Sequence, residues 1–263
     1  MLTTGDVLHY LDTLAPPYMK MDWDNVGLLC GSRTQPVRKI LLALDPFEGA
    51  TREAADWGAD LLVTHHPLLF HPAKAITDET GVGRTIRLLI SHNISAINAH
   101  TNLDCSPTGV NFVLAQTLGL ADIAVIAPQV TPEGEDWGLL RMGLVPEMPL
   151  ADFLPLVRGR LGCPGLRYAA GGRPVHRVAV GGGACADELA DAFAAGCDTF
   201  VTADVRYNQF WDAHDLGMNL IDAGHFWTEN PVIPALAQRL RAQFPEAEVR
   251  VSQTHTDCMR FYC

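Results

Sequence analysis

Residues 41–66, LLALDPFEGATREAADWGADLLVTHH, carry the clearest signal of the fold in this sequence. It opens with an apolar run that predicts a buried strand. The middle part, EGATREAADW, has helix composition and stops at Gly58, a typical C-cap. A second apolar run, 60–64, predicts another buried strand, and His65 and His66 follow it directly. Two strands joined by a helix through short connections indicate an α/β fold.

The neighbouring segments extend this pattern on both sides. An N-terminal helix is predicted up to Leu14, where Pro16 and Pro17 stop it. Beyond the paired histidines we expect a helix over 83–91 and a strand over 93–99. Strands and helices that alternate with short connections predict a mostly parallel sheet.

A second stretch of the chain repeats the first. Residues 178–204 read VAVGGGACADELADAFAAGCDTFVTAD, again a strand, a turn, a helix, Gly-x-Asp and a strand ending in Val-Thr. The match continues, because His100 with Asp104 and His225 with Glu229 each follow an apolar run at the same spacing. Two explanations are open: an internal duplication, or the general habit of α/β proteins to repeat βα units.

Length and composition bound the class of protein. The chain has 263 residues, of which 48% are hydrophobic and 19% charged, as expected of a globular protein. We expect no membrane span, since no apolar run approaches the roughly 18–20 residues that one needs, and no signal peptide is evident. Seven scattered cysteines without a C-x-x-C pair favour buried thiols in a reducing, cytoplasmic setting. The net charge of -11 makes nonspecific nucleic-acid binding, and with it a DNA-binding regulator, an unlikely function.

Polar clusters stand directly after three of the predicted strands. In parallel sheets the crevice at the carboxyl ends of the strands is the usual ligand site. Each cluster alone has another reading, a core histidine beside an exposed one or an exposed polar turn, but three together favour metal ligation. The six candidate ligands are His65, His66, His100, Asp104, His225 and Glu229.

Six ligands are too many for one catalytic zinc, which usually takes three from the protein. They suit two divalent ions about 3.5–4 Å apart, bridged by a water or hydroxide that can act as a nucleophile. Imidazoles and carboxylates without thiolates favour Zn, Fe, Mn, Co or Ni without choosing among them. Asp45, Asp204 and Asp222 also fall at strand ends, where they can orient ligand imidazoles or serve as turn and capping residues.

Four segments of the chain also carry a family resemblance. DNVG (24–27), THHPLLF (64–70), AHTNLD (99–104) with GVN (109–111), and GHFWTE (224–229) stand in order along nearly the whole chain. Together they resemble the signatures of the dinuclear metal-centre hexameric family, the NGG-interacting-factor-three-like proteins often labelled GTP cyclohydrolase I type 2 homologs.

The resemblance implies an architecture. We expect an α/β protein of two similar three-layer halves with mostly parallel sheets, and a metal site for two divalent ions in the cleft between them. The first half, 1–126, would carry the His-His and His-x-x-x-Asp motifs, and the second, 127–263, the His-x-x-x-Glu motif, with an approximate boundary and halves that can interleave. The Pro- and Gly-rich segment 125–177 is expected to hold the link between the halves, with short strands and one helix near 151–161. The resemblance further implies a homohexamer of the short form of the family.

The chain departs from the family at one position of chemical interest. Many members have a histidine where this chain has Tyr207-Asn208. If that histidine helps proton transfer, this protein lacks it or uses another, such as His71 or His214. For His71 a surface position is the alternative, and the sequence assigns no catalytic residue. Two functions stay open: a metal-dependent hydrolase acting on a nucleotide, phosphoester or amide, and a non-catalytic metal-binding scaffold or interaction protein.

Overall fold

The computed structural model describes residues 1–262, which form two compact units. The first unit combines Met1–Leu103 with Ile233–Thr256. The second contains Asp104–Val232 and the chain from Asp257 onward. The chain passes from one unit to the other inside the short helix α4, Thr101–Cys105.

The first unit is built on a five-stranded sheet in the order β1-β4-β3-β2-β13. Strands β13, β2, β3 and β4 run parallel, and β1 pairs antiparallel with β4 at one edge. The inner strands are buried on both faces, which explains their continuous apolar sequences. The strands are β1 (Gly27–Cys30), β2 (Lys39–Ala43), β3 (Leu61–Thr64), β4 (Ser95–Asn98) and β13 (Glu248–Val251).

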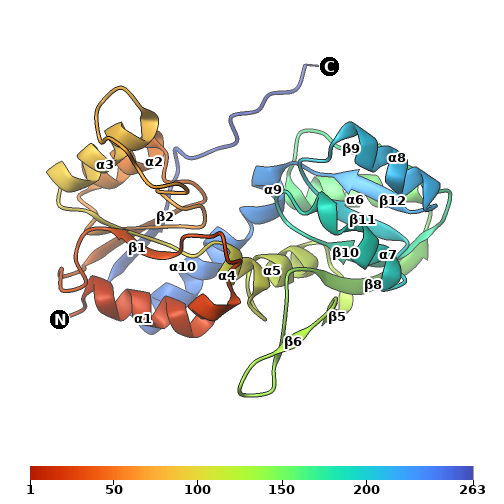
Figure 1. Cartoon of the computed structure of the whole chain (residues 1–263), viewed down its shortest axis with the longest axis horizontal. Coiled ribbons are helices and arrows are strands. Elements are labelled where there is room, and N and C mark those ends of the chain that lie inside the picture. Colours follow the sequence, from red (N-terminus) through yellow and green to blue (C-terminus); the bar gives the residue numbers. More distant parts are fainter. Residues whose placement is uncertain (263) are drawn as a thin grey trace. The chain divides into compact units, whose positions relative to one another are not determined.

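Helices cover both faces of this sheet. In Figure 1, α2 and α3 lie on one side and α1 and α10 on the other, which makes three layers. Thr3 begins α1 with a capping box that includes Asp6, and Gly58 ends α2 in the left-handed conformation at φ 72°. The helical segments are α1 (Thr4–Leu14), η1 (Pro17–Met19), α2 (Glu48–Trp57), α3 (Gly81–Ser91) and α10 (Val232–Gln243).

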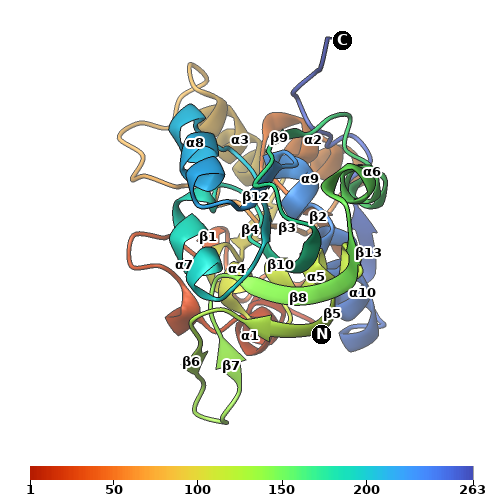
Figure 2. The same ribbon diagram turned by 90° about the vertical axis from the view of Figure 1, so that its right-hand side faces the viewer.

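The second unit has a six-stranded sheet in the order β5-β8-β10-β11-β12-β9. Its centre, β10 to β12, is parallel, whereas β8, β5 and β9 pair antiparallel around it. A separate hairpin of β6 and β7 extends away from this sheet in Figures 1 and 2. The strands are β5 (Ala121–Val125), β6 (Gln129–Val130), β7 (Asp136–Trp137), β8 (Arg141–Met148), β9 (Arg167–Ala169), β10 (Val175–Val180), β11 (Thr199–Thr202) and β12 (Asn219–Asp222).

Alternate residues of the central strands feed two separate cores. Val201 and Ile221 pack with α5 and α6 on one face, while Phe200 and Leu220 pack with α7 and α8 on the other. This unit is therefore also three-layered. Its helical segments are α5 (Val110–Thr117), α6 (Leu150–Leu161), η2 (Ala186–Glu188), α7 (Leu189–Ala194), α8 (Tyr207–Asp215) and α9 (His225–Glu229).

The α/β class and the parallel cores predicted from the sequence are confirmed. Both units contain three adjacent parallel strands in chain order, each set followed by a short helix, α4 or α9. The near-repeat therefore corresponds to a repeated topology. None of the helices within residues 1–262 is long and apolar enough to cross a membrane.

The compact units do not separate at residue 126, where the sequence analysis put an approximate boundary. Residues 104–126 belong to the second unit because α5 contacts β8 and β10. Residues 233–256 return to the first unit because β13 extends its sheet beside β2. Such non-local pairing leaves no local signal in the sequence.

Candidate metal centre

A cluster of three histidines lies at the carboxyl ends of β3 and β4 in the first unit. His65, His66 and His100 each offer a ring nitrogen, and these atoms all lie within 4.8 Å of one another. Their ring centroids are 4.9–5.5 Å apart. His65 is buried, whereas His66 and His100 are partly exposed. Nitrogens gathered this closely suit a divalent metal ion.

The far side of each ring is held by an acceptor. Nδ1 of His65 lies 2.8 Å from the carbonyl oxygen of Ala99. Because a carbonyl only accepts, this nitrogen carries the proton, which leaves Nε2 as the coordinating atom. Nδ1 of His66 lies 2.6 Å from Asp45 Oδ1, and Nδ1 of His100 lies 2.8 Å from Asp24 Oδ1. This is how proteins orient imidazoles that bind metals.

The two positioning carboxylates remain ionised. Burial alone would raise the pKa of Asp24, but hydrogen bonds from His100 and Thr101 outweigh it and lower that pKa well below its usual range. Burial opposes ionisation of Asp45 in the same way, and hydrogen bonds from His255 and His66 lower the pKa of Asp45. Both carboxylates therefore strengthen the histidines as ligands.

A second cluster of candidate ligands lies within the second unit. His225 and Glu229 sit one turn apart on α9, with Nε2 and Oε2 separated by 3.1 Å. A carboxylate oxygen of Asp104 on α4 lies within 4.8 Å of one from Glu229, and both side chains are buried. Nδ1 of His225 is 2.8 Å from Asp204 Oδ2. The predicted His-x-x-x-Glu face is thus confirmed as one turn of helix.

The electrostatics of the second cluster favour a positive charge. Burial alone would lower the pKa of His225, but Asp204 and Glu229 raise it to about 11. Two buried carboxylates as close as Asp104 and Glu229 repel each other unless a proton or a cation compensates them. A divalent ion would supply that charge, and its binding would displace protons.

A glycine makes room for Glu229. Gly183 adopts a left-handed φ of 63°, and a Cβ built on it would lie 2.1 Å from Glu229 Oε1 and 3.1 Å from His225 Nε2. The Gly183 amide donates to Thr228 Oγ1 at 3.0 Å. The neighbouring Gly182 amide donates to Asn111 Oδ1 at 2.6 Å, and Asn111 Nδ2 donates to the Asp104 carbonyl at 3.3 Å. The 181–183 glycines thus serve a tight turn under the ligands.

Of the three aspartates expected beside the ligands, two orient imidazoles. Asp45 holds His66 and Asp204 holds His225. Asp222 instead accepts from the amides of Val205 and Gly224 at 3.1 Å and 3.0 Å, so it fixes the loops around His225. Asp204 itself has a φ of 52°, a conformation that non-glycine residues adopt mainly at special sites.

Aromatic side chains border the histidine cluster. Trp23 and Phe70 are 61% and 47% exposed, and their rings contact His100 at centroid distances of 6.1 Å and 6.3 Å. His71 lies against Phe70 at 4.9 Å.

His214, Tyr207 and Trp227 belong to the second unit. His214 is on α8 beside Asp215, 3.3 Å away, and Tyr207 on the same helix is 79% exposed. Trp227 donates from Nε1 to Asp257 at 2.8 Å and packs on the core of this unit.

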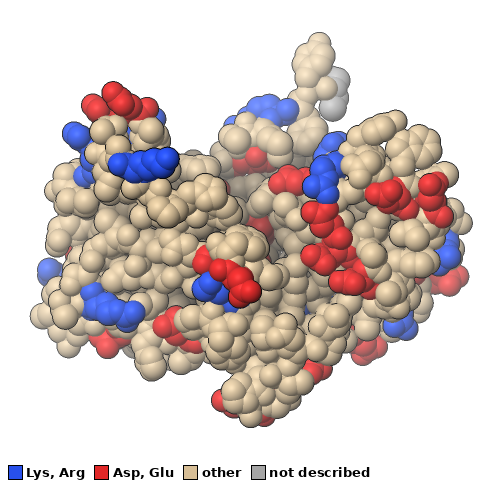
Figure 3. Space-filling model, viewed as in Figure 1, with Lys and Arg blue, Asp and Glu red and all other residues tan. Residues whose placement is uncertain are grey.

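The surface of the second unit carries concentrated acidic charge. Figure 3 shows acidic side chains gathered on one face of this unit. In the same unit, burial raises the pKa of Glu188, and the nearby carboxylates of Asp191 and Asp187 raise it further. Such a surface repels a phosphate backbone.

Several positioning residues have little signal in the sequence. Asp24 stands 76 residues before the histidine that it orients, although it belongs to the DNVG motif. Asn111 and Thr228 also fall within recognised motifs, which could have pointed to a role for them. His255 stands in an irregular segment after β13, and only the fold brings it to Asp45.

The fold and these clusters define an α/β protein with histidine and carboxylate groups that can hold metal ions. Residues 2–258 match the family described as Duf34/NIF3 (NGG1p interacting factor 3), and the chain belongs to this family.

Several relatives match over nearly their full length. The chain is 34% identical to a GTP cyclohydrolase 1 type 2 homolog of Clostridium perfringens, over 98% of both chains. Among solved structures, it is similar to a hypothetical protein of Staphylococcus aureus with a TM-score of 0.92, 30% identity and 99% coverage of both chains. A Bacillus cereus protein related to NIF3 matches with a TM-score of 0.94 and 25% identity, covering 100% of this chain and 99% of that one.

Proposed function

We propose that the protein binds two divalent metal ions and uses them in a hydrolytic reaction. These two ions would form one dinuclear centre. Its ligands would be His65, His66, His100, Asp104, His225 and Glu229.

One observation carries this proposal: every candidate histidine is fixed through Nδ1, which leaves Nε2 for coordination. The acceptors are a carbonyl for His65 and aspartates for His66, His100 and His225. Histidines that bind metals almost always donate their other ring N–H to an acceptor of this kind. A thiolate ligand from the nearby Cys185 is disfavoured, because burial raises the pKa of this thiol well above its usual value.

When bound, a pair of such ions would activate water for attack and stabilise developing negative charge. The chain's own contribution is to fix the ligands through Asp24, Asp45 and Asp204. The exposed faces of Trp23 and Phe70 beside His100 suit a planar substrate. A nucleotide ring, as the name of the C. perfringens relative suggests, is therefore the substrate class to test first, ahead of phosphoesters and amides.

The test loads purified, chelator-treated protein with Mn²⁺, Zn²⁺ or Fe²⁺ and assays it against nucleotides, phosphoesters and dipeptides. Turnover that is lost in His66→Ala and Glu229→Gln, but kept in the surface variant His9→Ala, supports the hydrolase. Stoichiometric metal binding without turnover on any substrate favours the non-catalytic scaffold instead. Failure of the wild type to bind metal overturns both.

We further propose a homohexamer acting in the cytoplasm. Exposed aromatic side chains such as Trp211 and Phe47 are typical of protein interfaces. The described cysteines are free thiols, as expected in a reducing compartment. Light scattering on the purified protein tests the assembly, and a monomeric mass would contradict it.

A further inference from the structure

We propose that His255 is a positioning residue for the histidine cluster, held in place by a clamp centred on Glu53. The inference rests on the proposed metal centre but concerns residues outside its ligand set. All the groups involved belong to the first unit.

The carboxylate of Asp45 is shared by two imidazoles. Asp45 Oδ1 lies 2.6 Å from His66 Nδ1, and Asp45 Oδ2 lies 2.9 Å from His255 Nε2. The side chains of His255 and Asp45 are only 11% and 15% exposed, so water competes little for this contact. With an imidazole nitrogen close to each of its oxygens, the carboxylate is held from both sides, which restricts the orientation of His66.

Backbone contacts hold His255 beside Asp45. His255 follows β13 in a segment without regular structure, so its own backbone gives it little rigidity. Its amide donates to Ser252 Oγ at 3.1 Å, and the Ser252 amide donates to the Leu42 carbonyl of β2 at 2.7 Å. The segment is therefore tied to the strand that ends just before Asp45.

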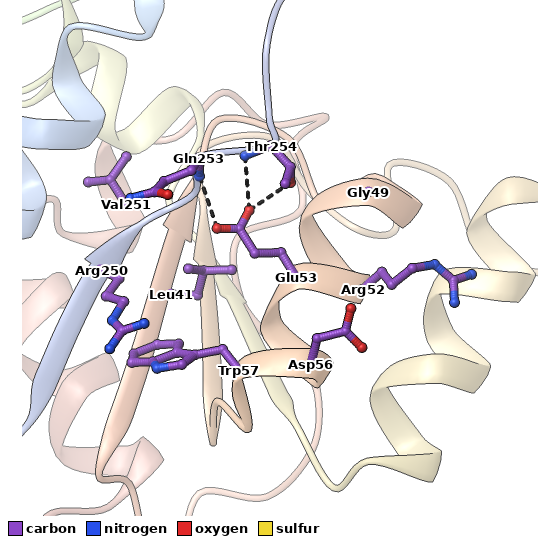
Figure 4. Close-up of a pocket in the computed structure, with 10 residues that line it drawn as sticks. All are labelled: Leu41, Gly49, Arg52, Glu53, Asp56, Trp57, Arg250, Val251, Gln253 and Thr254. Atoms are coloured by element: carbon purple, nitrogen blue, oxygen red, sulfur yellow. Dashed lines mark hydrogen bonds between the residues drawn. The ribbon is translucent and has the colours of Figure 1, made fainter.

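Glu53 of α2 closes the clamp, as Figure 4 shows. One carboxylate oxygen accepts from the Gln253 amide at 2.9 Å. The other accepts from the Thr254 amide and hydroxyl at 3.2 Å and 2.7 Å, and from the Ser252 hydroxyl at 2.5 Å. A surface carboxylate with four donors from three consecutive residues specifies one conformation for that segment. The segment's next residue is His255.

These contacts form a continuous series from Glu53 through the 252–254 segment to His255, Asp45 and His66. Asp45 lies one layer outside the ligands, where removal of a group typically changes metal affinity about 10- to 100-fold, and His255 acts on His66 through this carboxylate. A purely structural role would instead change the stability of the metal-free protein and leave the ligand geometry of the bound metal unchanged.

The test titrates Co²⁺ into chelator-treated full-length protein, following both affinity by chelator competition and the visible ligand-field spectrum. The variants are His255→Leu, which removes the donor, and His255→Gln, whose amide nitrogen can replace Nε2. Glu53→Gln perturbs the clamp. Asp56→Asn, at an exposed position of the same helix, is the matched control for the charge that Glu53→Gln removes. His9→Leu controls for loss of a histidine elsewhere.

We expect His255→Leu to weaken one Co²⁺ binding step by roughly tenfold or more and to shift the spectrum. His255→Gln should retain near wild-type affinity, and Glu53→Gln should weaken binding more than Asp56→Asn. Wild-type affinity and spectrum in folded His255→Leu would overturn the role of His255 but leave the proposed metal centre standing. If that variant folds poorly, equal affinities in Glu53→Gln and Asp56→Asn overturn it. A wild type that binds no Co²⁺ would instead refute the metal centre itself.

Discussion

Replacing Gly183 by alanine should damage the acidic cluster more than its small size suggests. The new Cβ would lie 2.1 Å from Glu229 Oε1, whereas contacting atoms prefer about 3.5–4.0 Å. Glu229 must then move by more than roughly 1 Å, and His225 Nε2, at 3.1 Å, is crowded as well. The left-handed backbone of residue 183 adds roughly 1–2 kcal/mol of instability for any side chain.

Gly196 provides the matched control. It has a similar φ of 77°, but a Cβ there meets no heavy atom of the described chain within 4 Å. Both alanine variants should therefore lose stability in urea denaturation with EDTA, and Gly183→Ala should lose more because only the Cβ at residue 183 meets Glu229. Only Gly183→Ala should also bind Zn²⁺ at least about tenfold more weakly by calorimetry. Wild-type affinity and stoichiometry in Gly183→Ala would refute the reasoning.

Three further predictions concern buried charges in the metal-free protein. Arg141 is 1% exposed and donates to four backbone carbonyls, including that of Ser106 at 2.7 Å. Arg141→Met should therefore lower the free energy of unfolding in urea by about 3 kcal/mol, and an unchanged midpoint would contradict this. The lowered pKa of Asp24 stabilises the folded protein above about pH 3.9, the pKa of this group in the unfolded chain, and the stabilisation is lost as the pH falls through the pKa in the folded state. The loss of unfolding free energy caused by Asp24→Asn should therefore shrink on acidification. The pKa of His225, raised to about 11, gives stability that is full below about 6.5 and lost as the pH rises toward 11. The advantage of wild type over His225→Gln should therefore decline between these values, and a constant difference would count against the charge assignment.

The parallel core of each unit could be predicted from the sequence because its signals are local. The stretch 41–66 carries its own strand, helix, left-handed Gly58 cap and strand, and the structure has them as α2 flanked by β2 and β3. The segment 125–177 was correctly expected to hold short strands and one helix, but not the eight-residue β8. That strand is half-buried beside β10 and β5, and its pairing partners stand far away in sequence.

The candidate ligands were accessible to sequence reasoning because strand ends concentrate them. His65 and His66 directly follow β3, and His225 and Glu229 are separated by one helical turn. The residues that orient them were harder to find. Contacts such as Asp24 with His100, or His255 with Asp45, join segments that only the completed sheet brings together.

X-ray absorption at the metal edge of protein loaded with two equivalents of Zn²⁺ tests the dinuclear centre most directly. We expect nitrogen and oxygen ligands at about 2.0–2.2 Å and a metal–metal distance near 3.5–4 Å. Isolated ions without metal–metal scattering, or sulfur ligands near 2.3 Å, would contradict it.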